Sequence, residues 1–229
     1  MTTSVRVELN TIVVWSDIGC PWAHAAVARL HRVRQELGLS DVVRFDLRAF
    51  PLEEFNRRPT PYDILSAEVP VVGALEPEAG WQVWQGRPGE WPVTTLPALE
   101  AVQAAKAQGL AASEALDRAL RRALFAESRC ISILPVILEV AESCGAVDVD
   151  RLGQALRRGE ARATVYEQMA EAEAGGVKGS PHVFLPDGTD AHNPGIQMHW
   201  QGEHGRGFPV VDHDDPGAYK ELLERAAGG

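Results

Sequence analysis

The residues of this chain best suited to chemistry are Cys20 and the two that follow it, Pro21 and Trp22. The cysteine comes shortly after an apolar run, residues 11–16, and a helical pattern begins directly behind it. A thiol at a helix N-terminus faces unpaired backbone N–H groups and the positive end of the helix dipole, which favour its thiolate. Proline fits the first helical position, where its missing N–H has no partner to lose. The pattern therefore predicts a reactive thiol rather than an inert buried cysteine.

Ala23 determines which kind of thiol chemistry the chain can perform. A cysteine at this position would pair with Cys20, and alanine rules out that internal disulfide. Of the other two thiols, Cys144 lies in an apolar helical pattern and is expected in the core, while Cys130 sits at a helix junction and is left unassigned. Single-thiol chemistry remains: a mixed disulfide with glutathione or a protein, or a group that positions a bound thiol.

Histidines are the other groups that could support catalysis or bind a metal. His24 follows Cys20 by one helical turn, where a protonated imidazole would lower the thiol pKa further. We favour an exposed histidine on the first turn instead, because histidine is close to neutral at physiological pH. No two histidines have the spacing of a zinc-binding motif, so no metal site is expected. Five of the seven fall in the C-terminal third of the chain: His182, His192, His199, His204 and His213.

The elements that must position Cys20 are a strand before it and a helix behind it. Residues 11–16 are β-branched or aromatic without polar alternation, which is typical of a buried strand. In residues 23–37 the apolar positions recur every three or four residues, which predicts a helix ended by Gly38. Residues 42–50 alternate between apolar and polar and form a second strand. Strand, helix and strand in this order predict a βαβ unit with parallel strands.

The next segment, residues 51–174, is expected to form a helical subdomain inserted after this unit. It opens with a stretch rich in proline, glycine and tryptophan. Trp81, Trp84 and Trp91 in this stretch either form a lid or wall of a substrate cleft, or anchor an irregular loop to the helices. The helices expected in the subdomain are residues 62–67, 96–108, 113–126, 134–144, 148–158 and 160–174.

The chain is then expected to return to the sheet. Residues 1–50 and 175–229 would together form one domain, and 51–174 the inserted subdomain. A proline and a glycine between two strand patterns predict a tight turn. The elements expected in the last part are a third strand at 182–185, a turn at 186–189, a fourth strand near 197–201 or 208–211, and a closing helix at 214–227.

This order of elements resembles the DsbA-like branch of the thioredoxin superfamily over most of the chain. Two motifs carry the likeness: Cys20-Pro21-Trp22 after the first strand, and the Gly-Ser-Pro run that ends at Pro181 before the third. The resemblance implies an α/β, thioredoxin-like fold with an inserted all-helical subdomain. It also implies a cis Ser180–Pro181 bond beside the catalytic Cys20. Pro21, Trp22, Ser180 and Pro181 would bind the substrate, an extended peptide or glutathione, with the Ser180 backbone left unpaired for it.

The resemblance leads to three functional hypotheses. The first is a DsbA-like thiol–disulfide oxidoreductase of the single-thiol type, with Cys20 as the nucleophile. The second is a glutathione-dependent isomerase or transferase, because 2-hydroxychromene-2-carboxylate isomerases and kappa-class glutathione transferases share this architecture; they usually carry serine where this chain has Cys20. The third is a degenerate fold that binds a peptide or small ligand without turnover. No resident cofactor is expected, and glutathione would act as a co-substrate.

Composition limits the partners. The 229 residues, 45% of them hydrophobic, support one fair-sized core, with or without an insertion. A net charge of -10 without a basic run argues against nucleic acid and anionic membranes as partners.

Residues 1–6 show no signal peptide and no apolar stretch approaches the ~20 residues of a membrane span, so a cytosolic protein is expected. The three cysteines do not form a disulfide framework, and the sequence is compatible with a homodimer without requiring one.

Overall fold

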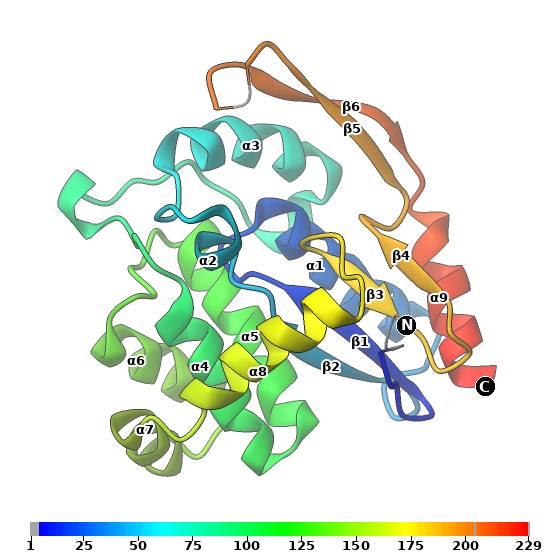
Figure 1. Cartoon of the computed structure of the whole chain (residues 1–229), viewed down its shortest axis with the longest axis horizontal. Coiled ribbons are helices and arrows are strands. Elements are labelled where there is room, and N and C mark those ends of the chain that lie inside the picture. Colours follow the sequence, from blue (N-terminus) through cyan, green and yellow to red (C-terminus); the bar gives the residue numbers. More distant parts are fainter. Residues whose placement is uncertain (1–4, 204, 229) are drawn as a thin grey trace.

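The structure, a computed structural model, describes residues 5–203 and 205–228. His204 and residues 1–4 lie outside the described residues. The expectation that no signal peptide is present rests partly on residues 1–4. Over the described part, the fold consists of a four-stranded sheet, a separate two-stranded hairpin and nine α-helices (Figure 1). This is the mixed α/β architecture that the sequence predicts.

The central sheet has the strand order β2-β1-β3-β4. β1 (Thr11–Ser16) runs parallel to β2 (Arg44–Ala49) and antiparallel to β3 (His182–Phe184). The parallel pair is connected through α1 (Pro21–Glu36), as the βαβ prediction requires. β3 pairs in turn with β4 (Asp190–His192), a short strand that the sequence analysis missed.

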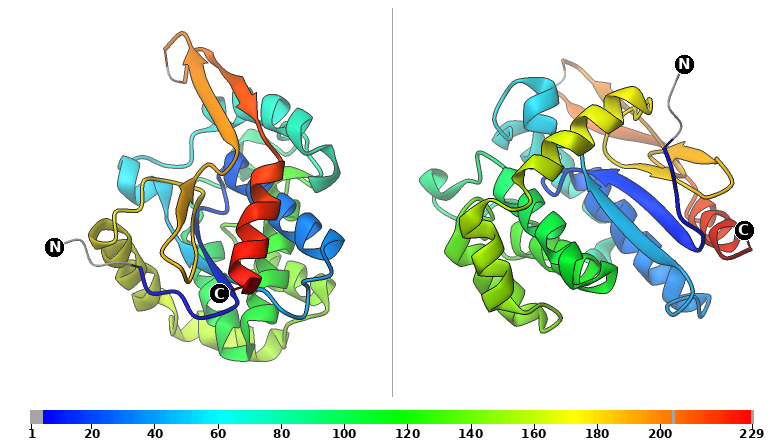
Figure 2. Two further views of the ribbon diagram at one scale, coloured as in Figure 1. Left: turned by 90° about the vertical axis from the view of Figure 1, so that its right-hand side faces the viewer. Right: turned by 60° about the horizontal axis from the view of Figure 1, so that its bottom comes forward.

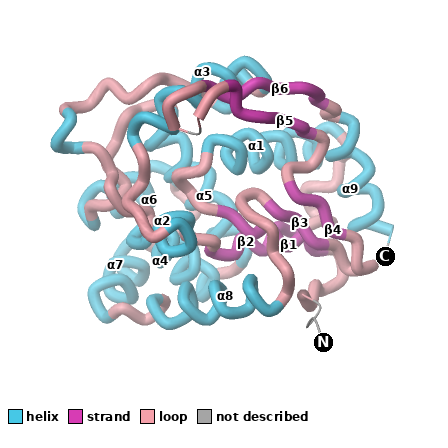
Figure 3. The backbone as a smooth tube through the Cα atoms, turned by 45° about the horizontal axis from the view of Figure 1, so that its top comes forward, coloured by secondary structure: helices cyan, strands magenta, loops and turns pink. Residues whose placement is uncertain are grey.

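Helices cover both faces of this sheet, with α8 on one side and α1 on the other (Figure 3). Ile12 and Val14 of β1 belong to the main core together with Leu30 of α1. Trp15, which points the other way, packs in a second cluster with Ala172 of α8. Because both faces of β1 are buried, every position of this strand tolerates an apolar side chain, and no polar alternation develops.

Seven α-helices lie between β2 and β3 in chain order, in the segment where the sequence predicts helices. Its division into a separate subdomain stays a prediction. The expected short helix at 62–67 extends to Leu75 and contains Pro70. The seven are α2 (Leu52–Asn56), α3 (Tyr62–Leu75), α4 (Leu96–Ala105), α5 (Leu110–Phe125), α6 (Leu134–Cys144), α7 (Val149–Arg158) and α8 (Arg162–Ala174), with short 3-10 helices η1 (Pro77–Ala79), η2 (Pro88–Glu90) and η3 (Lys106–Gln108).

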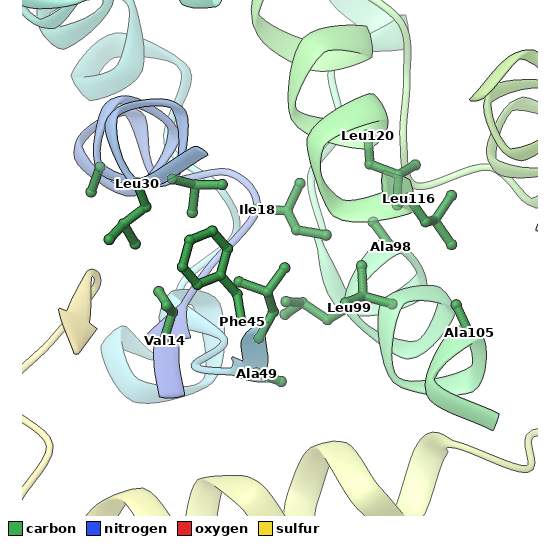
Figure 4. Close-up of a cluster of buried hydrophobic side chains, with 14 of the residues drawn as sticks. Val14, Ile18, Leu30, Phe45, Ala49, Ala98, Leu99, Ala105, Leu116 and Leu120 are labelled. Carbon is green, nitrogen blue, oxygen red and sulfur yellow. The ribbon is translucent and has the colours of Figure 1, made fainter. Parts of the chain in front are cut away.

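The core is continuous from the sheet into these helices. Leu30 of α1 and Phe45 of β2 meet Leu99 of α4 and Leu120 of α5 in one buried cluster (Figure 4). Each of these side chains is at most 3% exposed. Full burial of one such side chain stabilises the fold by about 1.5–3 kcal/mol, so this cluster fixes α4 and α5 against the sheet that carries the Cys20 loop.

Both segments proposed for a fourth strand do form strands, but neither joins the central sheet. β5 (Ile196–Gln201) and β6 (Phe208–Asp214) pair with each other as an antiparallel hairpin. The hairpin extends from the body and runs over α3 (Figure 2). α9 (Gly217–Gly228) follows it, beginning a few residues later than expected, and its Tyr219 returns to the main core.

Candidate active site

Cys20 occupies the N-cap position of α1, and Pro21 begins the helix, as predicted. The turn before it is held by Asp17, whose carboxylate accepts from the Gly19 N–H at 2.7 Å and whose carbonyl accepts from the Cys20 N–H at 3.3 Å. A side chain at Gly19 would lie 2.8 Å from the Thr95 methyl group, so only glycine lets the turn pass this closely. The local sequence thus presents the thiol at the end of a tight, buried turn.

The structure brings Ser180 to Cys20 across 160 residues of sequence. The Cys20 thiol donates to the Ser180 carbonyl oxygen, with the sulfur 3.2 Å away, and the Asp17 N–H donates to the Ser180 hydroxyl at 2.9 Å. The Ser180–Pro181 peptide bond is cis. The expectation that the Ser180 carbonyl is free for a substrate is wrong, because the thiol already binds it.

A cavity of about 270 Å³ opens beside the sulfur. Of the residues predicted to bind substrate, Pro21, Trp22 and Ser180 line it. Pro181 is buried and is not among its lining residues within the described chain; its carbonyl accepts from the Asn193 N–H instead. The wall opposite the cysteine comes from the segment around α2 and α3, with Glu53, Arg58, Thr60, Ile64 and Glu68 among its residues.

Glu68 is the residue of this cavity that sequence reasoning missed. It is 7% exposed, and its carboxylate accepts from the Trp22 indole N–H at 2.9 Å. Burial raises the pKa of Glu68 to about 7, and the indole hydrogen bond opposes that shift. The signal available was a single acid in the otherwise apolar pattern of residues 64–72, which by itself does not indicate a partner.

Burial raises the pKa of the Cys20 thiol to about 12. The negative charges of Glu68 and Asp17 add to this effect, while hydrogen bonds from the Ala23 N–H and with Ser180 oppose it. The sequence expectation of a thiolate stabilised by the helix N-terminus is therefore wrong for this state of the site, because desolvation and two acids outweigh the helix. Cys20 is a neutral thiol that donates a hydrogen bond.

A family model now connects this geometry with known proteins: the model of the DSBA-like thioredoxin domain matches residues 11–202. This chain belongs to that family. The match covers both halves of the site, Cys20 with its helix and Ser180 with the following strand. No curated protein matches the DSBA-like chain.

Solved structures similar to this DSBA-like protein share its fold at low identity. A probable DsbA oxidoreductase from Streptomyces coelicolor aligns with TM-score 0.64 and 21% identity, over 95% of this chain and 90% of that one. The cytosolic disulfide reductase DsbM from Pseudomonas aeruginosa, in a structure with GSH, gives 0.56 and 18%, over 95% and 96%. A 2-hydroxychromene-2-carboxylate isomerase gives 0.58 and 18%, over 79% and 87%. At these identities the likeness shows the fold alone.

Arg121 of α5 holds the loop between β1 and Cys20. This side chain is 1% exposed, and its guanidinium donates to Asp117 at 2.7 and 3.1 Å. It also donates to the Ser16 hydroxyl at 2.8 Å and to the Asp17 carbonyl at 2.9 Å. A buried ion pair of one helix thereby fixes the end of β1 and the turn before Cys20, which no local sequence pattern predicts.

His24 does not support the thiol as a cation. It is 5% exposed rather than exposed on the first turn, so the sequence expectation is wrong. Its ring stacks on Phe125, contacts Trp81 and places Nε2 3.3 Å from the Gly80 carbonyl. Burial, followed by the charge of Arg121, lowers the pKa of His24 to about 3, so the imidazole is neutral at physiological pH.

No other thiol pairs with Cys20. Ala23 is fully buried at the position where a second cysteine would lie. Cys130 and Cys144 are both free and half-buried, so Cys144 is not the core residue expected; its thiol donates to the Ala141 carbonyl at 3.1 Å. In this structure Cys20 therefore has no internal disulfide partner.

The tryptophans of the irregular segment anchor it rather than line the Cys20 cavity. Trp81 donates to the Glu76 carbonyl at 2.8 Å, and Trp91 to the Thr60 carbonyl at 2.9 Å. Together with Trp84 they pack against the main core.

Within residues 5–203 and 205–228 no group of histidine, cysteine and acidic residues could hold a metal ion. None of the helices in that part is long and apolar enough to cross a membrane.

Proposed function

We propose that this DSBA-like protein is a thiol–disulfide oxidoreductase of the single-thiol type, with glutathione as the co-substrate. The observation that carries the proposal is the contact of Cys20 with Ser180 at a cavity whose lining residues, within the described chain, include no second cysteine. The Pseudomonas aeruginosa neighbour, named a cytosolic disulfide reductase and solved with GSH, supports a thiol substrate and a cytosolic reaction. The protein would need no resident cofactor.

The proposed reaction consists of two exchanges. The Cys20 thiolate attacks a glutathionylated thiol, forms a Cys20–glutathione disulfide and releases the other sulfur as a thiolate. A glutathione thiolate then attacks this mixed disulfide at the glutathione sulfur, which yields glutathione disulfide and returns the Cys20 thiolate. One disulfide is broken and one formed in each step, so glutathione is the net reductant.

The raised pKa of Cys20 slows the first exchange. At neutral pH the thiol is protonated, and only its small thiolate fraction attacks. In the second exchange Cys20 is the leaving group, and a thiolate of high pKa leaves slowly, so this step is slowed as well. The rate of turnover should therefore rise with pH above neutrality rather than level off at acidic pH.

The test is reduction of a glutathionylated peptide by glutathione, followed as peptide thiol released. The Cys130→Ser/Cys144→Ser double variant should retain the activity of the wild type, and Cys20→Ser should lose it. Turnover that persists in Cys20→Ser would contradict the proposal, as would its absence from the wild type across the alkaline range.

A second candidate function is favoured by one observation: Cys20 is a neutral donor rather than an anion. A thiol of this kind could donate to the thiolate of bound glutathione without forming a disulfide, as the isomerase hypothesis requires. The fold of the 2-hydroxychromene-2-carboxylate isomerase is similar. Cys20→Ser keeps a hydroxyl donor, so in this case glutathione affinity and activity on an aromatic substrate survive Cys20→Ser and are lost in Cys20→Ala. Glutathione binding with neither activity would instead indicate the degenerate, non-catalytic fold.

A further inference from the structure

The turn that carries Ser180 meets the Cys20 loop with two of its groups. The Ser180 carbonyl accepts from the Cys20 thiol at 3.2 Å, and the Ser180 hydroxyl accepts from the Asp17 N–H at 2.9 Å. The cysteine is only 4% exposed in this arrangement. Its reactivity therefore depends on how often the turn moves away, and on what holds the turn in place.

His182, two residues after Ser180, binds this turn through its side chain. Its Nδ1 accepts from the Lys178 N–H at 3.0 Å, so the residues between them are closed into a ring. The imidazole is 1% exposed, which shields the bond from water. Because a backbone N–H only donates, Nδ1 carries no proton, and the proton of the neutral ring is on Nε2.

Asp190 of β4 accepts that proton in a hydrogen bond. His182 pairs with His192 in the register of β3 and β4, which makes Asp190 a diagonal neighbour of His182 on the same face of the sheet. The His182 Nε2 lies 2.8 Å from the carboxylate, so its N–H donates to Asp190. The carboxylate thereby fixes the tautomer and leaves Nδ1 free to accept from Lys178.

The ring must also stay neutral for this arrangement to persist. A proton on Nδ1 would face the Lys178 N–H, and two donors cannot bind each other. Burial lowers the pKa of His182 and the charge of Lys178 adds to this effect, while Asp190 opposes it. His192 packs edge to face against the same ring, and burial lowers its pKa as well. The His182 imidazole is therefore neutral at physiological pH.

The other side of the turn is braced by the end of β4. A side chain at Gly179 would lie 2.8 Å from the His192 Nε2, so only glycine lets the turn pass this ring. The Asn193 N–H donates to the Pro181 carbonyl at 3.0 Å. With this side fixed by backbone and glycine, His182 is the side chain that closes the turn from within.

We propose that His182 is a positioning residue for the chemistry of Cys20, with Asp190 setting its tautomer. The imidazole holds the Lys178 N–H, and this keeps the Ser180 carbonyl and hydroxyl against the Cys20 loop. The role rests on the function proposed for Cys20. His182 acts through Ser180 alone, since it is not among the lining residues of the Cys20 cavity within the described chain.

The first test is the nitrogen NMR spectrum of the histidine side chains in the labelled full chain at neutral pH, which needs no enzymatic activity. The signals of His182 are those lost in His182→Asn. They should show a protonated Nε2 and an unprotonated Nδ1. A ring protonated at Nδ1, or at both nitrogens, would overturn the proposal, because the Lys178 N–H would then have no acceptor.

The second test is the rate at which iodoacetamide modifies Cys20 at one neutral pH, in the Cys130→Ser/Cys144→Ser background. His182→Phe keeps a ring and removes the acceptor, so the turn opens more often. The rate should rise about tenfold, the usual effect of a hydrogen-bond donor left facing an apolar side chain. His182→Asn has an acceptor oxygen as many bonds from Cα as Nδ1, and should restore the slow rate.

Turnover of the glutathionylated peptide should change in the opposite direction. In His182→Phe the Ser180 groups are no longer held for the substrate, so kcat/KM should fall while alkylation rises. Ile137→Val, a fully buried change in the main core on α6, lowers stability without touching the turn and should alter neither rate. Alkylation raised equally in Ile137→Val would reduce the effect to a general loss of stability and overturn the proposal.

Asp190→Ala tests the tautomer separately, and it decides should His182→Phe fail to fold by circular dichroism. It should speed alkylation less than His182→Phe does, because the Lys178 N–H still favours the same tautomer. Asp212→Ala is the matched control, since it removes an exposed carboxylate from His199 in the hairpin. Equal rates in these two variants, or a fast His182→Asn, would contradict the role of His182. A wild type without turnover would refute the function proposed for Cys20, whereas the NMR and alkylation results would still decide the position of the turn.

Discussion

Two regions along α1 bury titratable groups beside charges of different sign, acidic in one region and basic in the other. At the start of the helix, Cys20 lies beside Glu68 and Asp17, and burial and both acids raise the pKa of its thiol. Further along, His24 and His31 lie near arginines, and burial and those charges lower the pKa of each imidazole. All three groups are neutral at physiological pH. The comparison teaches that desolvation keeps all three groups neutral, and that the neighbouring charges reinforce it at each position along the helix.

Arg121 is the residue common to the two regions. It lines a cavity of about 520 Å³ between α1 and α5, and its guanidinium also holds the loop before Cys20. The largest effect is expected from Asp117→Asn, which leaves the buried guanidinium without its counter-charge. It should lower the free energy of unfolding by about 4 kcal/mol, the usual cost of breaking a buried ion pair. Urea unfolding measures it. Glu160→Gln, which removes an exposed pair with Arg158, is the control and should change stability by less than about 1 kcal/mol. Equal effects of the two would disprove the role of Arg121.

The next effect is acid sensitivity caused by His24. Its pKa in the folded state, about 3, lies below the value of 6.5 for an unperturbed histidine, so the unfolded chain binds the proton first. Stability is thus complete above 6.5 and is lost as pH falls towards 3. His24→Phe should reduce the loss between pH 6.5 and about 4 by about 3 kcal/mol, measured as unfolding midpoints against pH. His213→Phe, a change at an exposed position, is the control. A loss of stability at acidic pH that is unchanged in His24→Phe would show that His24 does not cause it.

Cys20 should react slowly with alkylating agents. A pKa of about 12 lowers the thiolate fraction at neutral pH by more than three orders of magnitude relative to free cysteine, and the higher nucleophilicity of a basic thiolate recovers about half of this logarithmic difference. Iodoacetamide should therefore modify Cys20 about a hundredfold more slowly than N-acetylcysteine. The reaction is followed by mass spectrometry in the Cys130→Ser/Cys144→Ser variant. A rate that is already on a plateau at acidic pH would show an activated thiolate instead.

The last effect concerns Glu68, whose pH dependence has the opposite sign to that of His24. Its pKa is raised in the folded state from 4.5 to about 7, so the folded chain keeps a proton that the unfolded chain has lost. Stability therefore falls as pH rises through this window. Glu68→Gln should abolish about 3 kcal/mol of that loss. Asp63→Asn, an exposed acid in the first turn of the same helix, is the control. A pH slope that persists in Glu68→Gln would assign it to another group.

Parts of the fold and of the site were predictable from the sequence, some from local patterns and some from the family resemblance. The apolar run of residues 11–16 and the proline behind Cys20 indicate a strand and a helix start by themselves, whereas the cis Ser180–Pro181 bond was implied by the resemblance to the DsbA-like branch. Their meeting follows from β1 and β3 pairing in one sheet. Single-residue signals of turn and helix start are strong where they depend only on neighbouring residues.

What could not be predicted depends on contacts between distant segments. Glu68, Arg121 and the buried state of His24 follow from the packing of α3 and α5 against α1, which no spacing reveals. The same packing reverses the expected ionisation of Cys20, since the helix N-terminus is visible in the sequence and the desolvation around it is not. β4 was missed because three residues contain too little alternation to indicate a strand.

The measurement that tests the central claim most directly is the intact mass of the Cys130→Ser/Cys144→Ser variant after incubation with glutathione disulfide at alkaline pH. The account predicts one added glutathionyl group, located on Cys20 by peptide mapping and removed by excess glutathione. An unmodified protein that still reacts with iodoacetamide at Cys20 would contradict it, because the thiol would then be accessible and yet unable to exchange with a disulfide.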